Sequence, residues 1–105
     1  MAYTIVVSPQ SRQDIIETAD YIQKKNGKEQ AASWKNEVLK AIASLQEMPL
    51  RCPVADESED MGLELHELHY RVHRILFLVD EDANTVQILR VYHSSRAPLQ
   101  LEDLP

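Results

Sequence analysis

Cysteine, glycine and long apolar runs are scarce in this chain of 105 residues. The single cysteine, Cys52, excludes an internal disulfide and the paired cysteines of common zinc sites. Two glycines provide no glycine-rich loop to cradle a phosphate. No apolar run approaches the roughly 20 residues of a membrane span, and the first residues lack the features of a signal peptide. We therefore expect a cytoplasmic protein without a membrane contact.

Basic residues are also in deficit, with 11 Lys and Arg against 17 Asp and Glu and a net charge of −6. This balance disfavours a broad nucleic-acid-binding surface, because such affinity comes mainly from Lys and Arg that displace counterions. The distribution is uneven, since every lysine lies at or before position 40 and the second half carries only arginines. Arginine suits planar contacts with phosphate or carboxylate. A local basic spot on an acidic body is therefore compatible with the composition.

The first half of the chain predicts a strand followed by two helices. A β-branched run at 3–7 predicts the strand, and Ser8-Pro9 marks the start of an amphipathic helix over 9–25. Asn26-Gly27 ends that helix. Apolar residues at helical spacing from 31 to 45 predict a second helix that ends near position 48, before a proline. Together the two helices form a hairpin.

The second half predicts an acidic loop and three antiparallel strands. The loop covers 49–62, and the strands are expected at about 63–68, 70–79 and 85–93, with a turn at 80–84. The predicted class is α+β with the order β-α-α-β-β-β, in a single domain over residues 1–105. The N-terminal strand and helical hairpin should pack on one face of a small, mainly antiparallel sheet.

Strand alternation places two arginines on otherwise apolar faces. Arg74 is expected to share a face with Tyr70, and Arg90 to share a face with Ile88 and Tyr92. A buried cation needs a partner, because an unpaired buried charge is very costly. Either each arginine pairs with an acid such as Glu37, Glu64 or Glu67, or both line a pocket for a phosphate, a carboxylate or a protein tail.

Histidines are the other candidates for chemistry. His69 and His73 are expected to share a face while His66 points the other way, so the sequence predicts no metal site. His93 and Arg96 follow the last strand, where a histidine can act as a general acid or base and an arginine can stabilise phosphoryl charge. The alternative is a histidine that caps the strand end and a solvated arginine.

Two further residue types are assigned structural roles. Cys52 lies in a loop between prolines with no base beside it, which disfavours nucleophilic chemistry. Trp34 falls in the apolar stripe of the second helix and is expected in the core.

Two segments of the predicted sheet carry a family resemblance. Residues 70–79 contain R-I-L-F, and residues 86–96 contain I-L-R-V-x-H-x-x-R. With Ser8-Pro9, Asp14-Ile15 and Tyr21-Ile22 near the first helix, the chain resembles over essentially its full length the RelE/ParE toxins of bacterial type II toxin–antitoxin systems, also called plasmid stabilisation proteins.

The resemblance implies one of two activities. RelE-like members cleave mRNA on the ribosome without a metal, using basic side chains on the sheet, whereas ParE-like members bind and inhibit DNA gyrase. By position, Arg74 matches the arginine that RelE-like enzymes place at the phosphate, and in that case Arg74, His93 and Arg96 are the catalytic candidates. The lysines of RelE-like enzymes are missing, and the ending His93-x-x-Arg96 is more similar to the ParE-like side.

The resemblance also implies partners but no cofactor. The expected partner is a cognate antitoxin, encoded by the adjacent gene, whose C-terminal segment wraps the helical hairpin and the sheet face. A homodimer and a toxin–antitoxin hetero-oligomer are both compatible with the sequence. The candidate residues for binding the antitoxin or the target are Ile15, Ile22, Trp34, Val38, Tyr70, Arg90 and Tyr92.

The acidic composition favours the ParE-like activity, because a ribosome-dependent nuclease needs several cations around one phosphate. We therefore expect a toxin that inhibits DNA gyrase by protein–protein binding. An mRNA endonuclease is the second interpretation, and a non-toxic family member the third.

Overall fold

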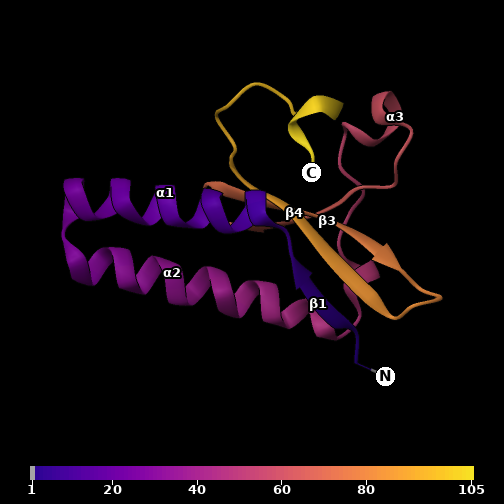
Figure 1. The fold of residues 1–105 in the computed structure, drawn as a ribbon, viewed down its shortest axis with the longest axis horizontal. Helices are drawn as coiled ribbons and strands as arrows, with labels where there is room; N and C mark the ends of the chain where they lie inside the picture. The colour runs from indigo at the N-terminus through magenta and orange to yellow at the C-terminus, as the bar shows by residue number, and fades with distance from the viewer. Residues whose placement is uncertain (1) are drawn as a thin grey trace.

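The computed structural model describes residues 2–105, and it places a helical hairpin beside a four-stranded sheet (Figure 1). The strands are β1 (Thr4–Val7), β2 (His66–Tyr70), β3 (His73–Asp80) and β4 (Thr85–His93), and the helices are α1 (Pro9–Asn26), α2 (Lys28–Ala43) and the short α3 (Ser58–Met61). The sheet order is β1-β4-β3-β2, with β1 parallel to β4 and the other neighbours antiparallel. The predicted α+β class and element order are confirmed.

The hairpin forms because the chain caps α1 and reverses at once. The Ser8 hydroxyl accepts a hydrogen bond from the Ser11 N–H at 3.1 Å, and Pro9 occupies the first helical position. Gly27 has φ 97°, a left-handed conformation that costs a glycine little, and α2 begins directly after it. The turn between the helices is therefore a single residue.

The second helix ends earlier than the prediction near position 48. Regular α-helix stops at Ala43 and tightens to a 3₁₀ turn over Ser44–Gln46. Met48 then adopts φ 49°, and the Arg51 guanidinium donates to the carbonyls of Glu47 at 2.6 Å and Met48 at 3.1 Å. This side chain satisfies carbonyls that a continued helix would have paired.

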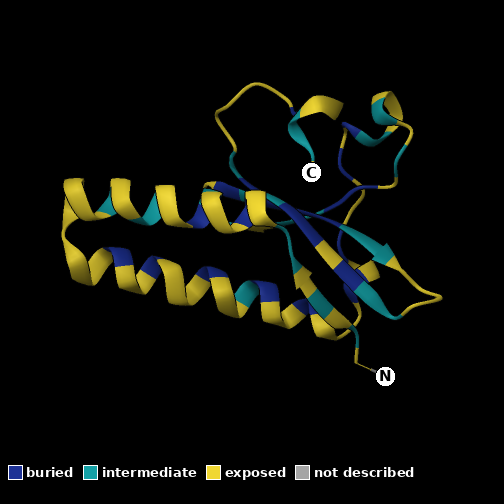
Figure 2. Cartoon of the chain, in the orientation of Figure 1, coloured by how far each residue is buried: buried dark blue, intermediate teal, exposed yellow. Residues whose placement is uncertain are grey.

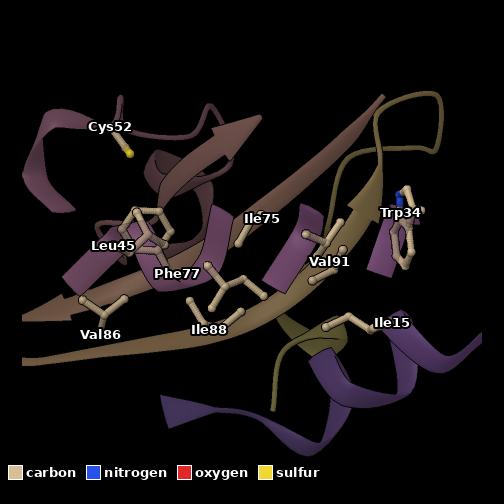
Figure 3. Packing of buried hydrophobic residues seen from close by; sticks show 11 residues of the cluster. Ile15, Trp34, Leu45, Cys52, Ile75, Phe77, Val86, Ile88 and Val91 are labelled. Atoms are coloured by element: carbon tan, nitrogen blue, oxygen red, sulfur yellow. The ribbon is translucent and has the colours of Figure 1, made fainter. Parts of the chain in front are cut away.

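The main core lies between the hairpin and one face of the sheet (Figure 3). The buried cluster contains Ile15, Trp34, Val38, Ile42 and Leu45 from the hairpin side and Cys52, Ile75, Phe77, Val86, Ile88 and Val91 from the loop and sheet. The far half of the hairpin extends beyond the sheet, where its surface is mostly exposed (Figure 2). The half near the sheet thus packs on the main core, whereas the far half is held by the packing of the two helices against each other.

The turn between β2 and β3 corrects two predictions. Tyr70 pairs with His73 across a two-residue turn in which Arg71 has φ 53°, so Tyr70 belongs to the first of these strands. Cross-strand partners share a face, so Tyr70 and His73 face the helices, whereas His69 pairs with Arg74 on the opposite face. The predictions that His69 shares a face with His73, and Tyr70 with Arg74, are wrong because the turn lies inside the segment to which simple alternation was applied.

A β-bulge in β4 corrects a third prediction. Phe77 pairs with Ile88, but the next residue back along β3, Leu76, pairs with Arg90, which leaves Leu89 as the extra residue. Ile88 therefore faces the helices, whereas Arg90 and Tyr92 lie on the other face. The expected grouping of Ile88 with Arg90 is wrong because the bulge shifts the alternation by one residue.

The face opposite the hairpin carries a second, smaller core. Its buried residues are Ala55, Leu65, Leu76, Leu89 and Leu99. The loop at 53–63 and the C-terminal segment 97–105 cover this face (Figure 1). The predicted acidic loop therefore includes buried positions and the short helix α3.

An ion cluster ties this loop to the sheet. The Arg74 guanidinium donates to both carboxylate oxygens of Glu57, at 2.8 and 2.7 Å, and its Nε donates to Glu67 at 2.8 Å. The side chains of Arg74 and Glu57 are only 15% and 6% exposed. Hydrogen bonds from Arg74 hold the pKa of Glu57 at about 2, below its ordinary value of 4.5, against the opposing effect of burial. Of the predicted acidic partners of Arg74, Glu67 is confirmed, and Glu57 is an additional one.

The depressed pKa of Glu57 predicts an acid-dependent loss of stability. A carboxylate with a lowered folded-state pKa stabilises the fold fully above about pH 4.5, and this contribution disappears as the pH falls towards 2. We expect Glu57→Gln to lower the free energy of unfolding by about 3 kcal/mol at neutral pH. The difference in the free energy of unfolding between wild type and variant should decrease below pH 4.5. Urea unfolding from pH 7 to pH 2 measures it.

The matched control for this prediction is Glu59→Gln, in the same loop but exposed. This variant should stay within about 0.5 kcal/mol of wild type at every pH. Equal effects of the two substitutions, or a constant gap down to pH 2, would contradict the role assigned to Glu57.

Candidate functional site

A cavity of about 370 Å³ opens between α1 and the end of β4. Its lining comprises Asp14, Glu17, Thr18 and Tyr21 from α1, His73 from β3, and Arg90, Val91, Tyr92, His93, Ser95 and Arg96 from β4 and the turn after it. The cavity therefore contains four of the predicted site residues: Arg90, Tyr92, His93 and Arg96.

The first turns of α1 lie here because β1 is too short to cover the edge of β4. β1 pairs with β4 only as far as Ile88. From this point on, side chains of α1 make hydrogen bonds to the backbone of β4. Ser11 donates its hydroxyl to the Ile88 carbonyl at 3.0 Å, and Asp14 accepts the Val91 N–H at 2.9 Å. Side chains of the helix thus replace the missing strand and form one wall of the cavity.

Arg90 is held in place by two other segments. Its Nε and Nη2 donate to the two carboxylate oxygens of Asp14, at 2.8 and 2.9 Å, and its Nη1 donates to the Asp103 carbonyl at 2.8 Å. The bonds to Asp14 raise the pKa of Arg90. The expectation that Arg90 pairs with an acid is confirmed, but the acid is Asp14 rather than Glu37, Glu64 or Glu67, because the edge of β4 faces α1.

His93 has a defined orientation. Its Nδ1 accepts the Ser95 N–H at 3.0 Å and lies 2.7 Å from the Ser95 hydroxyl. Because Nδ1 is an acceptor, the proton of the neutral ring lies on Nε2. His93 can therefore donate a hydrogen bond from Nε2.

His73 connects this site to the core. Its ring centroid lies 5.2 Å from those of His93 and Trp34, and both contacts are edge-on. Burial lowers the pKa of His73, and the neighbouring His93 lowers it further. The Nδ1 of His73 and the Nε1 of Trp34 are buried without a hydrogen-bond partner among the described residues. An uncharged His73 is the form that this packing stabilises at neutral pH.

Arg96 is the free cation at the cavity mouth. Its guanidinium lies 5.5 Å from the centre of the Tyr92 ring, which is the range of a cation–π contact. Within residues 2–105, no acidic side chain lies at ion-pair distance from Arg96. It can therefore meet a ligand or a partner without breaking an existing pair.

The three catalytic candidates do not converge. His93 pairs with His73 on the helix-facing side of the sheet, whereas Arg74 pairs with Tyr92 on the other side. Arg74 is also occupied by two carboxylates. His93 and Arg96 lie together at the cavity, and Arg74 lies in a separate ion cluster.

Several candidate binding residues are already covered within the monomer. Ile15, Trp34 and Val38 are buried in the main core, and Ile22 and Tyr70 are half-buried against it. Their apolar surface is largely covered by the sheet, so little of it is left for a partner to contact.

Two acidic residues, Asp14 and Glu57, were not predicted from the sequence as partners of the arginines. Asp14 precedes the apolar residue Ile15 in the helix, a weak sign that it lies near the sheet. Glu57 stands in a run of acidic residues, and no spacing distinguishes it from its neighbours.

Other site types are not supported by the described part of the chain. Residues 2–105 contain no group of three His, Cys, Asp or Glu side chains arranged to hold a metal ion. Burial raises the pKa of the Cys52 thiol, which disfavours the nucleophilic thiolate. No helix in the same range has the length and apolarity needed to cross a bilayer.

Comparisons with known proteins point to one family. The sequence profile described as "ParE toxin of type II toxin-antitoxin system, parDE" matches residues 5–98. The solved chromosomal ParDE system from P. aeruginosa is similar with a TM-score of 0.72 and 18% identity, over 88% of this chain and 96% of that one. The RelBE2 toxin–antitoxin complex from Mycobacterium tuberculosis follows with a TM-score of 0.60 and 25% identity, over 89% and 99%.

A search of curated protein sequences gives no significant match. The profile match covers most of the chain, and both solved structures share its order of strand, hairpin and sheet. The chain belongs to the ParE/RelE family of toxins from type II toxin–antitoxin systems.

Proposed function

We propose that this chain acts as a ParE-like toxin, which inhibits DNA gyrase by protein–protein binding and is neutralised by an antitoxin from the adjacent gene. Both proteins would meet it in the cytoplasm. The profile match is to ParE toxins, and the two similar structures come from a ParDE system and a RelBE2 complex.

The state of Arg74 is the observation that carries this proposal. A nuclease arginine must be free to meet the charge that develops on the scissile phosphate. Here the guanidinium is bound on two sides by Glu57 and Glu67, at hydrogen-bond distances of 2.7 to 2.8 Å. A phosphate would have to displace a buried carboxylate pair, which costs far more than exchanging water.

The placement of lysines supports the same conclusion. All lysines lie on the helical hairpin, and the three strands of the second half contain none. Cleavage of RNA without a metal needs several cations around one phosphate. The sheet instead presents arginines that are already paired, so its chemistry suits binding to protein better than phosphoryl transfer.

The cavity at the end of β4 offers a contact site for such a target. Arg96 is unpaired there, and Tyr21 and Tyr92 provide aromatic surface beside it. Arginine and tyrosine side chains contribute strongly to many protein interfaces. We infer that the target, or part of it, contacts this end of the sheet.

One observation favours the second candidate, a ribosome-dependent mRNA endonuclease. His93 can donate a hydrogen bond from Nε2, and Arg96 lies in the same cavity, so a hydrogen-bond donor and a cation for a phosphate lie together. These two residues would have to act without Arg74, since it lies on the other face. A family member without toxicity is the third candidate.

The first test separates the three candidates. We expect induction of the protein to arrest growth, the purified protein to inhibit gyrase supercoiling, and primer extension on cellular mRNA to show no new cleavage. Arrest with cut messages and unaffected supercoiling would establish the endonuclease instead. Growth without arrest would favour the non-toxic member.

The second test compares two arginines. Arg96→Gln should weaken inhibition of gyrase about tenfold or more, because an exposed interface arginine is removed without loss of a core contact. The control is Arg71→Gln, an exposed arginine in the turn between β2 and β3, which should keep wild-type inhibition. Equal inhibition by both variants would rule out the cavity as the contact site.

The third test concerns Arg74. In an endonuclease that used Arg74 at the phosphate, as the resemblance to RelE-like enzymes implies, Arg74→Gln should remove about 3 kcal/mol of transition-state stabilisation, a loss of about two orders of magnitude in cleavage rate. An endonuclease that used only His93 and Arg96 should keep its cleavage rate in this variant. In a gyrase inhibitor, we expect the folded fraction of this variant to retain inhibition, with a loss seen mainly in thermal stability. Circular dichroism and supercoiling assays on the same sample measure both quantities.

A further inference from the structure

Most charges in the cavity at the end of β4 are already satisfied. Arg90 and Asp14 bind each other there. Glu17, on the wall formed by α1, accepts a hydrogen bond from Gln13 at 2.9 Å. Arg96 is the other guanidinium in the lining, and within the described part of the chain no carboxylate lies at ion-pair distance from it. The cavity therefore contains one positive charge that the described residues leave unpaired.

A neutral hydrogen-bond donor lies in the same cavity. The Nδ1 of His93 accepts the Ser95 N–H at 3.0 Å and lies 2.7 Å from the Ser95 hydroxyl. The proton of the neutral ring is therefore on Nε2, and the contacts with Ser95 fix the orientation of the ring. His93 and Arg96 both line the cavity, so a group that enters it can meet a donor and a cation together.

Two tyrosines give the cavity an apolar surface. The Tyr92 hydroxyl donates to the Ala97 carbonyl at 3.1 Å, and the Arg96 guanidinium lies 5.5 Å from the centre of the Tyr92 ring. Tyr21 is 62% exposed on the wall formed by α1. A cation that is already held against a ring loses less freedom on binding than a fully mobile one. The site therefore suits a side chain with a charged end and a short apolar stem.

The balance of charge favours a carboxylate over a phosphate. A carboxylate carries one negative charge and can accept hydrogen bonds from a guanidinium and a ring N–H at the same time. A phosphate monoester carries up to two charges, and Glu17 in the same lining would repel the second. The cavity of about 370 Å³ also has room for a whole side chain.

We propose that this cavity binds an aspartate or glutamate side chain of a partner protein, whose carboxylate lies between Arg96 and the Nε2–H of His93. The methylene groups of that side chain pack on the rings of Tyr21 and Tyr92. Identifying the partner as DNA gyrase rests on the proposed function. The like charge of Glu17 weakens binding of the carboxylate, so removal of this charge should strengthen it.

The first measurement uses the full chain and two small probes, N-acetylglutamate N-methylamide and N-acetylglutamine N-methylamide, which differ in the charge of the side chain. In nuclear magnetic resonance titrations, we expect the glutamate probe to shift the side-chain signals of Arg96 and His93. It should bind about tenfold more tightly than the glutamine probe, because a carboxylate makes a charge-assisted hydrogen bond to a guanidinium. Equal affinities of the two probes would overturn the carboxylate site.

Three variants locate the binding site of the glutamate probe. Arg96→Gln should lower its affinity about tenfold, whereas Glu17→Gln should raise it about threefold, because a like charge is removed from an exposed wall. The matched control is Arg71→Gln, since Arg71 is exposed and also lies over a tyrosine ring, at 5.6 Å from its centre. This control should bind the probe as wild type does. Unchanged affinity in Arg96→Gln, or an equal loss in Arg71→Gln, would overturn the site.

Inorganic phosphate is the third probe. We expect it to bind wild type more weakly than the glutamate probe, because a second negative charge meets Glu17 and no second free cation. Phosphate binding that is tighter than glutamate binding and is lost in Arg96→Gln would overturn the carboxylate assignment. That result would instead favour the endonuclease.

Inhibition of gyrase supercoiling tests the identity of the partner. Arg96→Glu should lose more inhibition than Arg96→Gln, because its carboxylate would repel the acidic side chain of the target. If both variants inhibit as wild type does while the glutamate probe still requires Arg96, the site stands and gyrase is not its partner. If Arg96→Gln loses inhibition but the glutamate and glutamine probes bind equally, the carboxylate site is wrong and the proposed function stands. The two failures are therefore distinguishable.

Discussion

The Asp14–Arg90 pair is the interaction on which the arrangement of this molecule depends. Asp14 holds the guanidinium with both oxygens and also accepts the Val91 N–H, so one carboxylate joins α1 to the edge of β4 where β1 has ended. Arg90 in turn holds the C-terminal segment through the Asp103 carbonyl. The hairpin, the sheet and the C-terminal segment meet at this pair, and the cavity forms beside it.

A second ion cluster, around Arg74, lies on the same face of the sheet as Arg90. Arg74 is bound by Glu57 and Glu67, and Glu57 also accepts the Leu99 N–H, so both clusters hold the C-terminal segment. Each arginine is satisfied by acids close to it, which is why a chain of net charge −6 can bury two guanidinium groups. Of the two arginines that line the cavity, Arg90 is paired and Arg96 has no acidic partner among the described residues, so Arg96 is the one left for a ligand.

The spacing of apolar residues predicted the buried faces correctly wherever the helices and strands are regular. The helical stripes of the hairpin correctly predicted a core that contains Ile15, Trp34 and Val38, and the N-terminal cap of α1 lies at Ser8 as expected. Simple alternation failed at two irregular points, the two-residue turn after Tyr70 and the bulge at Leu89. Each shifts the pattern by one residue, which moves every later side chain to the other face.

The sequence by itself determined the order of elements, the helical hairpin, the class of fold, the resemblance to a toxin family and the need of two buried arginines for partners. Which acids serve as partners was decided only by the tertiary structure. Asp14 lies 76 residues from Arg90, and Glu57 lies 17 residues from Arg74 within a run of similar acids. Such pairs depend on strand register, on the bulge and on where β1 ends, and these are set by packing between distant segments rather than by any local pattern.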